Sequence, residues 1–269
     1  MNMNKLFLRT KSAFVFSVSL LMVFTVSTAV IAAPEKAILP PILCLLLCDN
    51  DDSPPIAATS PLNDTGITWG GDYPSGNNAT CTGETIGQQD CSQGRDATHN
   101  DDSDGHAGFS FTKIDATGTE LPVAMNSWSC VKDNVTGLMW EKKTDDGGAH
   151  DKDTTYRWGG ITALGRNHAS KEGTYYDDWN VLVNAANNNS LCGYNDWRVP
   201  NLKELDSIVH LGTTNPAVDT GYFPNTESSV YWSSSPRVNH IFVAWNVNFD
   251  YGFGSNSNRG GDYYVRLVR

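Results

Sequence analysis

CGYNDWRVPNLKELDSIVHLG, residues 192–212, joins a cysteine, a short extended run and an amphipathic helix with almost no intervening loop. Pro200 ends the extended run, because proline has no backbone N–H and biases the preceding Val199 away from helical geometry. Asn201 is predicted to cap a new helix, with Glu204 three residues later as its capping-box partner. The stretch therefore predicts a strand followed directly by a helix.

The apolar side chains of this helix recur at helical spacing, so they share one face, and Gly212 is placed to end the helix. We expect this face, together with Trp197, to form the hub of the fold. Arg198 does not suit an apolar core, and we expect it to form an ion pair with an acidic neighbour. The apolar face consists of Leu202, Leu205, Ile208 and Val209.

The N-terminus resembles an export signal over residues 1–33. Lys5, Arg9 and Lys11 precede a mostly apolar run, and small residues before Pro34 provide a cleavage point. Because the run is long enough to span a bilayer, an uncleaved membrane anchor is the alternative. Residues 34–64 end in an acidic, Pro-rich piece and are predicted to form a disordered linker. We expect an exported protein that is periplasmic, displayed on the cell surface or secreted.

Charge and length limit the class of protein. The formal net charge is −11, and loss of Lys5, Arg9 and Lys11 with the signal would make it −14. This balance argues against nucleic acid as a partner, and membrane contact is expected only through an uncleaved signal. The remaining chain of about 236 residues suits one large domain, or a domain with an extension.

Six cysteines are present, and none forms a CxxC motif or a cluster with histidine at zinc spacing. Export permits disulfides. We pair Cys81 with Cys91 and Cys130 with Cys192, which leaves Cys44 and Cys48 in the linker. Four cysteines allow three connectivities, so the spacing alone does not decide the pairing.

Residues 65–127 have few aliphatic side chains and are predicted to form a loop-rich extension that contains a disulfide. Within it, Asn100, Asp102 and Asp104 occupy positions one, three and five of a calcium loop. Position twelve is Phe111, where an EF-hand requires glutamate, so this is no EF-hand. The two hypotheses are a Ca²⁺ site and a solvated acidic turn.

Residues 128–269 alternate between strand and helix patterns. Strands are predicted at 138–142, 230–234, 241–249 and 263–268, and a helix is predicted to begin near Asp177 or Asp178. The strand at 241–249 places Asn246 and Asn248 on a polar face that we expect to be solvated. Residues 250–262 are predicted to form a long loop, and long loops in compact domains are often functional. The mixture of hairpins and helices indicates an α+β fold.

Four motifs that occur in order support a family resemblance. They are DNVTGLMW at 133–140, DWRVPNLKEL at 196–205, YWSS at 231–234 and VRLVR at 265–269. With them, residues 128–269 resemble the domain at the C-terminus of the Legionella collagen-like adhesin. The resemblance implies a C-type lectin-like fold with two helices and small antiparallel sheets, in a surface or secreted protein that binds glycans. The chain departs from the adhesin in having no collagen-like repeats and no excess of basic residues.

The first functional hypothesis is an adhesion module that recognises carbohydrate through the loop between the last two strands. Sugars require aromatic faces for stacking and planar amides or charged groups for hydroxyls. The second hypothesis is a structural or protein-interaction protein of the envelope with no glycan ligand. We expect no enzyme, since neither HExxH nor a nucleophile elbow occurs. The candidate ligand-binding residues are Asn246, Asn248, Tyr251, Phe253, Asn256, Asn258 and Arg259.

Overall fold

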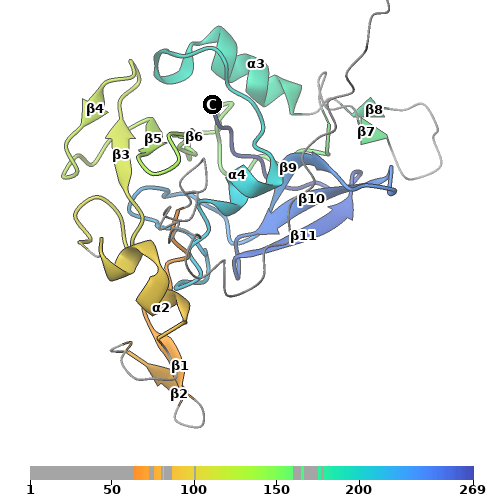
Figure 1. Ribbon diagram of the computed structural model, residues 1–269. Coiled ribbons are helices and arrows are strands. Elements are labelled where there is room, and N and C mark those ends of the chain that lie inside the picture. The colour runs from red at the N-terminus through yellow and green to blue at the C-terminus, as the bar shows by residue number, and fades with distance from the viewer. Residues whose placement is uncertain are drawn as a thin grey trace, which may run out of the picture. The chain divides into compact units, whose positions relative to one another are not determined.

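The computed structural model describes residues 63–72, 76–79, 81, 87–99, 101–159, 165–166, 175–176 and 179–269. The predicted signal, Cys44, Cys48 and all but the last two residues of the predicted linker lie outside these ranges. The described residues all belong to one compact unit. They combine short helices with antiparallel sheets, which confirms the predicted α+β class (Figure 1). Among them, no helix has the length and apolar character needed to cross a membrane.

A four-stranded sheet crosses the boundary that we predicted between residues 127 and 128. Its strand order is β4 (Glu120–Leu121), β3 (Phe111–Ile114), β5 (Cys130–Asp133) and β6 (Met139–Glu141). The ladder between β3 and β5 runs from Phe111 opposite Asp133 to Ile114 opposite Cys130. The segment predicted as an extension therefore contributes two strands to the same sheet as the domain.

A three-stranded sheet has the order β11 (Phe253–Asn258), β10 (Val243–Asn248) and β9 (Val230–Pro236). The strands predicted at 230–234 and 241–249 are confirmed, although Ile241 is 59% exposed and precedes β10. The prediction of a loop over residues 250–262 is wrong, because β11 occupies much of it. Gly252, at φ +76°, allows the tight reversal, and hydrogen bonding to β10 then holds a strand rich in glycine, serine and asparagine.

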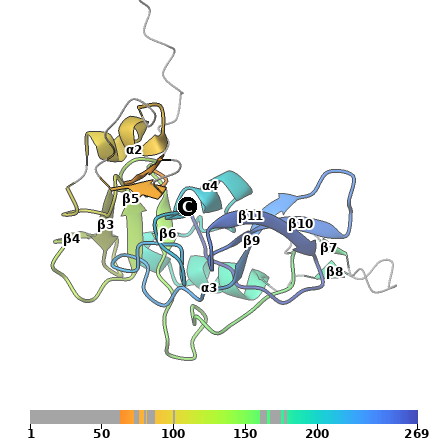
Figure 2. The ribbon, with the colours of Figure 1, turned by 90° about the horizontal axis from the view of Figure 1, so that it is seen from below.

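The two longer helices lie on opposite sides of this sheet (Figure 2). α3 (Asn180–Asn188) packs Leu182 and Ala186 into one apolar cluster, with Trp232 of β9 and Ala244 of β10. On the other side, α4 (Leu202–Asp206) packs Leu205 into a second cluster, with Tyr231 and Val247. Tyr231 and the next residue of β9, Trp232, therefore enter different clusters, as the period of two in a strand requires.

α4 confirms the predicted cap but not the predicted length. The Asn201 side chain accepts the Glu204 N–H at 3.0 Å, and the Asn201 N–H donates to the Glu204 carboxylate at 2.8 Å. The helix ends at Asp206 instead of continuing toward Gly212. Ile208 and Val209 are nevertheless buried, because the turn after the helix keeps them against the second cluster. Arg198 forms the predicted ion pair, with Glu204, through two hydrogen bonds of 2.7 Å.

The C-terminal segment predicted as a closing strand is extended but makes only isolated bridges. Tyr263 pairs with Tyr156 and Tyr264 with Tyr231, while Val268 pairs with both Trp140 and Arg198. It passes through the middle of the fold, where Figure 1 marks the C-terminus. The segment therefore connects several elements instead of extending one sheet.

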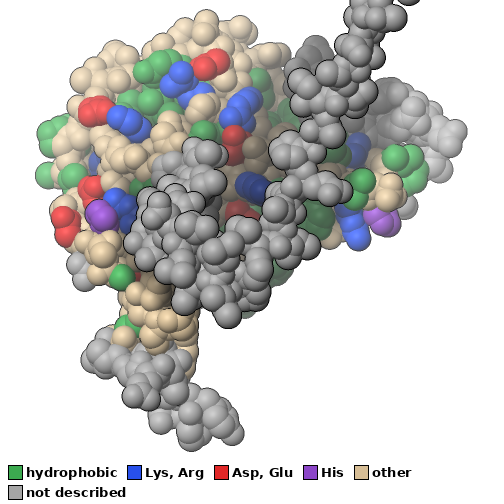
Figure 3. Space-filling model, viewed as in Figure 1, with side chains coloured by type: hydrophobic (Ala, Val, Ile, Leu, Met, Phe, Trp, Pro, Cys, Tyr) green, Lys and Arg blue, Asp and Glu red, His purple; other side chains and the backbone are tan. Residues whose placement is uncertain are grey.

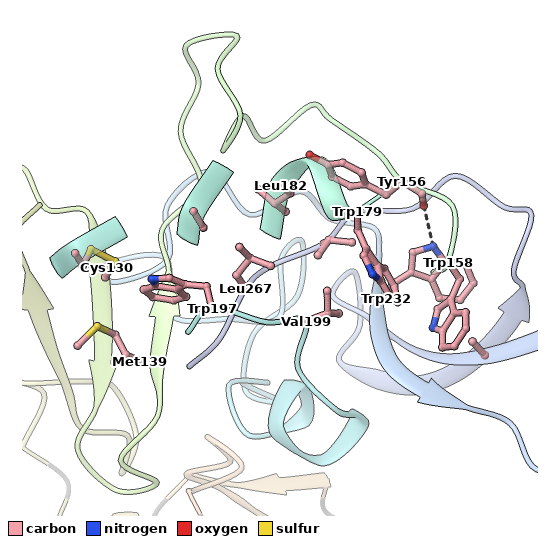
Figure 4. Packing of buried hydrophobic residues seen from close by; sticks show 14 of the residues in the cluster. Cys130, Met139, Tyr156, Trp158, Trp179, Leu182, Trp197, Val199, Trp232 and Leu267 are labelled. Atoms are coloured by element: carbon pink, nitrogen blue, oxygen red, sulfur yellow. Dashed lines mark hydrogen bonds between the residues drawn. A yellow bond between two sulfur atoms is a disulfide. The ribbon is translucent and has the colours of Figure 1, made fainter. Parts of the chain in front are cut away.

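The predicted hub is divided between the two clusters, because Trp197 belongs to the first, whereas Leu205, Ile208 and Val209 of the predicted helix face belong to the second. Trp197 is 2% exposed, and its indole N–H donates to Leu191 O at 2.9 Å. A disulfide joins Cys192 to Cys130 of β5 beside it, as Figure 4 shows, and a second disulfide joins Cys81 to Cys91. Both are the pairings that we predicted. In the same view Trp158, Trp179 and Trp232 gather at the other end of the cluster.

The remaining elements are short. Two small antiparallel sheets pair β1 (Gly70–Asp72) with β2 (Gly76–Asn78), and β7 (Gly165–Arg166) with β8 (Tyr175–Tyr176). α2 (Asp90–Gln93) contains Cys91 and is followed by a 3-10 turn over Arg95–Ala97. The predicted helix start at 177–178 lies outside the described residues.

Candidate functional site

The residues predicted to bind a ligand lie on the β10–β11 hairpin and directly after it, but their surroundings differ. Tyr251 and Phe253, at its turn, are 61% and 48% exposed. Asn248 is half-buried, and its Oδ1 accepts the Asp250 N–H at 2.7 Å. The aromatic faces are therefore open to solvent, while this asparagine shapes the turn.

A second group lies along the middle of the hairpin. Asn256 is opposite Trp245, and its Oδ1 accepts a hydrogen bond from Arg237 at 2.9 Å. The Arg237 guanidinium lies 5.9 Å from the centre of the Trp245 ring. Asn258 is exposed and accepts the Gly260 N–H at 2.9 Å. Sequence reasoning missed Arg237 as well as Trp245, a tryptophan that is only half-buried.

Two predicted residues are buried. Asn246 is 0% exposed, so the prediction that it lies on a solvated face is wrong. It lies between Trp232 and Ser255 on neighbouring strands, on the side of the sheet that α3 helps to cover. Arg259 is 8% exposed, with its guanidinium 4.1 Å from the centre of the Trp158 ring. The fold holds both side chains inside the protein.

A pocket of about 490 Å³ lies beside the turn of this hairpin, between the end of α4 and the first described residues. Its described walls come from three segments, and the hairpin supplies glycines instead of Tyr251 or Phe253. The lining residues are Asn63, Asp64, Thr65, Lys203, Asp206, Ser207, Val209, Leu211, Gly252 and Gly254.

Two charged side chains in the pocket have no partner within the described part of the chain. Lys203 and Asp206 are one turn apart on α4, and neither forms an ion pair or a side-chain hydrogen bond there. Both keep exposed surface, yet surrounding protein displaces enough water from Asp206 to raise the pKa of its carboxyl. Sequence reasoning missed both, although their position opposite Leu205 on an amphipathic helix indicated a solvent-facing pair.

The packing around the pocket requires glycine at position 252 but not at position 254. A Cβ at Gly252 would lie 2.8 Å from Val209 Cγ1 and 2.9 Å from Leu211 Cδ2, and its φ of +76° disfavours other residues. At Gly254 the nearest atom to a Cβ would be Leu202 Cδ1, at 3.9 Å. The close approach of the turn to the 209–211 segment therefore forms one wall of the pocket.

The predicted calcium turn is only partly described. Asn100 lies outside the described residues. Asp102 Oδ1 lies 2.9 Å from His106 Nδ1, and the Asp104 carboxylate accepts the Ser110 hydroxyl at 2.5 Å. In the part of the chain that the structure describes, no three His, Cys, Asp or Glu side chains converge on a metal position. A Ca²⁺ site at this turn stays a prediction.

A strongly perturbed charge cluster lies inside the protein, away from the pocket. Glu141 is 0% exposed, and its Oε1 lies 3.2 Å from Lys143 Nζ and 2.7 Å from His150 Nδ1. Its Oε2 accepts the Leu267 N–H at 2.8 Å. Burial alone would raise the pKa of Glu141, but Lys143, His150 and the Leu267 N–H together lower it to about 2. The cluster links β6 to the C-terminal segment, so its role is to stabilise the fold.

The fold and site thus define an α+β domain that has buried disulfide and ionic links and a pocket beside a hairpin. Residues 129–269, more than half of the chain, match the Lcl C-terminal domain family, and the protein belongs to that family. This confirms the resemblance carried by the four ordered motifs. A search of curated proteins finds no match, and a search of solved structures finds none either.

Proposed function

We propose that this protein is an exported binding or adhesion module of the bacterial envelope whose ligand is carbohydrate. The observation that carries the proposal is the pocket of about 490 Å³ beside the β10–β11 turn. It combines apolar walls from Val209 and Leu211 with unpartnered polar groups on Lys203 and Asp206, in the described part of the chain. A sugar needs both kinds of surface, because its ring faces are apolar and its edge carries hydroxyls.

The expected ligand is neutral instead of sulfated. The pocket contains two carboxylates, Asp64 and Asp206, against one ammonium, Lys203. Acidic and basic side chains are interspersed on the face seen in Figure 3, without a continuous basic patch. Sulfate esters would therefore meet repulsion that a neutral saccharide avoids. Tyr251 and Phe253, exposed next to the pocket glycines, offer aromatic surface for a longer chain.

Export is supported by the disulfides. The Cys81–Cys91 and Cys130–Cys192 bonds suit an oxidising compartment, in agreement with the predicted signal over residues 1–33. A periplasmic, surface or secreted location remains part of the proposal. The observed antiparallel sheets and helices are compatible with a C-type lectin-like fold, which stays a prediction from the family resemblance.

A glycan array with neutral, amino and sulfated saccharides tests the proposal. We expect binding to neutral glycans, with affinity reduced about tenfold or more by Asp206→Asn or Lys203→Ala, since a ligand hydrogen bond contributes about 1.5 kcal/mol. Asp262→Asn is the matched control, because Asp262 is exposed and does not line the pocket. Equal binding by the Asp206→Asn variant and the control would exclude the pocket as the site.

The alternative, a protein-interaction function without a glycan ligand, is favoured by one observation. β11 is an edge strand of its sheet, and the exposed Tyr251, Phe253 and Leu211 lie close to its start. An exposed strand edge beside apolar side chains can pair with another polypeptide. A pull-down tests this alternative. If no glycan binds, and if a protein partner is recovered whose binding is lost in the Phe253→Ala variant, the alternative replaces the carbohydrate proposal.

A further inference from the structure

Asp96 has a buried carboxylate oxygen without a hydrogen-bond partner. The residue is 5% exposed, and its Oδ1 is buried with no donor in the described structure. An unpaired polar atom in the interior costs free energy, and an unpaired carboxylate oxygen costs more than a neutral group. A proton, a water molecule or a cation can compensate such an atom in a native fold.

Two more oxygens approach the same place. A Cβ built on Gly94 would lie 2.7 Å from Asp96 Oδ1, 3.0 Å from Asp64 Oδ2 and 3.0 Å from Asp90 O. Two carboxylate oxygens and one backbone carbonyl, which also accepts the Gly94 N–H, therefore lie close together on one side of Gly94. Asp64 is itself 8% exposed, so the second carboxylate is also taken out of water.

Backbone N–H groups hold both oxygens of the Asp64 carboxylate in place. Asp64 Oδ1 accepts the Gly66 N–H at 3.1 Å, and Asp64 Oδ2 accepts the Asp96 N–H at 2.9 Å. Each oxygen keeps a second lone pair for another ligand. Gly108 also allows close approach, since a Cβ there would lie 2.8 Å from Asp64 Oδ2. Main-chain contacts therefore fix the Asp64 carboxylate next to the unpartnered oxygen of Asp96.

No cationic side chain compensates this pair of carboxylates. The neighbouring Arg95 donates from Nη1 to Gly108 O, and among the described residues it forms no ion pair with Asp64 or Asp96. Burial, and next the charge of Asp64, raise the pKa of Asp96. A bound divalent cation would reverse this balance, because its charge favours the ionised carboxylate.

We propose that Asp64, Asp96 and the carbonyl of Asp90 form a calcium site, distinct from the predicted Asp102–Asp104 turn. All the donors are oxygens, which suits a hard cation and not zinc, whose usual ligands are nitrogen and sulfur. Ca²⁺ accepts irregular geometry with six to eight oxygens, so solvent would supply the rest, whereas Mg²⁺ demands a near-ideal octahedron. Two carboxylates match the weaker class of extracellular sites, with Kd of about 0.1–1 mM.

The site would connect separate parts of the chain. Asp64 follows the predicted linker and lines the pocket, whereas Asp90 and Asp96 flank the α2 turn that contains the disulfide-bonded Cys91. Calcium would therefore fix the pocket wall formed by residues 63–65 against the α2 block. This inference does not require the pocket to bind carbohydrate.

The test is titration of CaCl₂ into the EDTA-treated mature chain, followed by calorimetry and by thermal melting, with MgCl₂ for comparison. We expect one calcium ion per chain and a rise in melting temperature of roughly 5 °C or more at about one hundred times Kd. Asp96→Asn should abolish both effects. Asp104→Asn, in the predicted turn, should leave both unchanged.

Three results would overturn the proposal. The first is the absence of any calcium effect on the wild-type chain. If Asp96→Asn is then as stable as wild type, Asp96 is protonated in the native protein. The second is a calcium effect that survives Asp96→Asn. The third is an effect that only Asp104→Asn removes, which places the ion at the turn. If Asp96→Asn does not fold, amide NMR shifts of the wild type decide, since calcium should move Gly66, Gly94 and Gly108 more than Ser103.

Discussion

Removal of the buried Glu141 carboxylate should destabilise the fold more than most surface substitutions. Glu141→Gln keeps the shape of the side chain but leaves the Lys143 ammonium, 1% exposed, without its anionic partner. Loss of one member of a buried ion pair costs about 3–5 kcal/mol. For a domain of this size that corresponds to a fall in melting temperature of roughly 6–20 °C.

The lowered pKa of Glu141 corresponds to a similar magnitude. It is lowered from 4.5 to about 2, which corresponds to roughly 3 kcal/mol of stability that requires the ionised carboxylate. Burial lowers the pKa of Lys143 despite the attraction of Glu141, and Arg266 adds repulsion. The ion pair therefore stabilises the charged form of Glu141 more than the charged form of Lys143. The carboxylate gains more because His150 and the Leu267 N–H also bind it directly.

The sign of the pH dependence follows from a folded-state pKa below the unfolded value. The contribution of Glu141 is complete above about pH 4.5 and is lost as the pH falls toward 2. Urea unfolding, monitored by tryptophan fluorescence between pH 7 and 3, measures it. The gap in unfolding free energy between wild type and Glu141→Gln should narrow as the pH decreases.

A double substitution separates the ion pair from other effects. In Glu141→Gln with Lys143→Met, no uncompensated ammonium remains, so the double variant should be more stable than Glu141→Gln alone. Two results would refute the reasoning: a cost below about 1 kcal/mol for Glu141→Gln, or a free-energy gap that is constant from pH 7 to 3.

Two further predictions concern single contacts. His210 is 1% exposed and its Nδ1 accepts the Gly212 N–H at 3.0 Å, while burial and then His106 lower its pKa, with Asp219 and Asp64 opposing. Stability should therefore fall as the pH drops below about 6.5, and His210→Phe should remove that slope in pH-dependent urea unfolding; an unchanged slope would contradict the assignment. Asn201→Ala removes the cap of α4 and should cost about 1 kcal/mol by urea unfolding, and a cost near zero would show that the cap is dispensable.

The parts of the fold that local chemistry specifies were predictable from the sequence. The capping box depends on Asn201 and Glu204, three residues apart, and Arg198 lies close enough in sequence to reach the same glutamate. Pro200 separates the extended run at 197–199 from α4, because a proline disfavours helical geometry at the residue before it whatever the distant contacts are. The pairing of Cys130 with Cys192 matched our choice, but spacing alone could not exclude the other connectivities.

The parts that depend on distant contacts were not predictable. β11 has a composition typical of a loop and becomes a strand because β10 supplies its hydrogen-bond partners. Asn246 has the pattern of a solvated position, but the apolar cluster that contains Trp232 covers that face of the sheet. Glu141 and Lys143 alternate with Trp140 as surface residues would, and only the return of the C-terminal segment buries them.

The arrangement of the motifs indicates why family membership says more about fold than about ligand. The DWRVP stretch exchanges two hydrogen bonds of 2.9 Å with the C-terminal VRLVR segment, between Arg198 and Val268. That segment in turn binds Glu141, directly after the DNVTGLMW motif. Three of the motifs that identify the family thus hold one another in place, and substitutions at their buried positions destabilise the domain most. Exposed residues such as Lys203 and Tyr251 can change at a cost below about 0.5 kcal/mol, so the ligand can change while the fold persists.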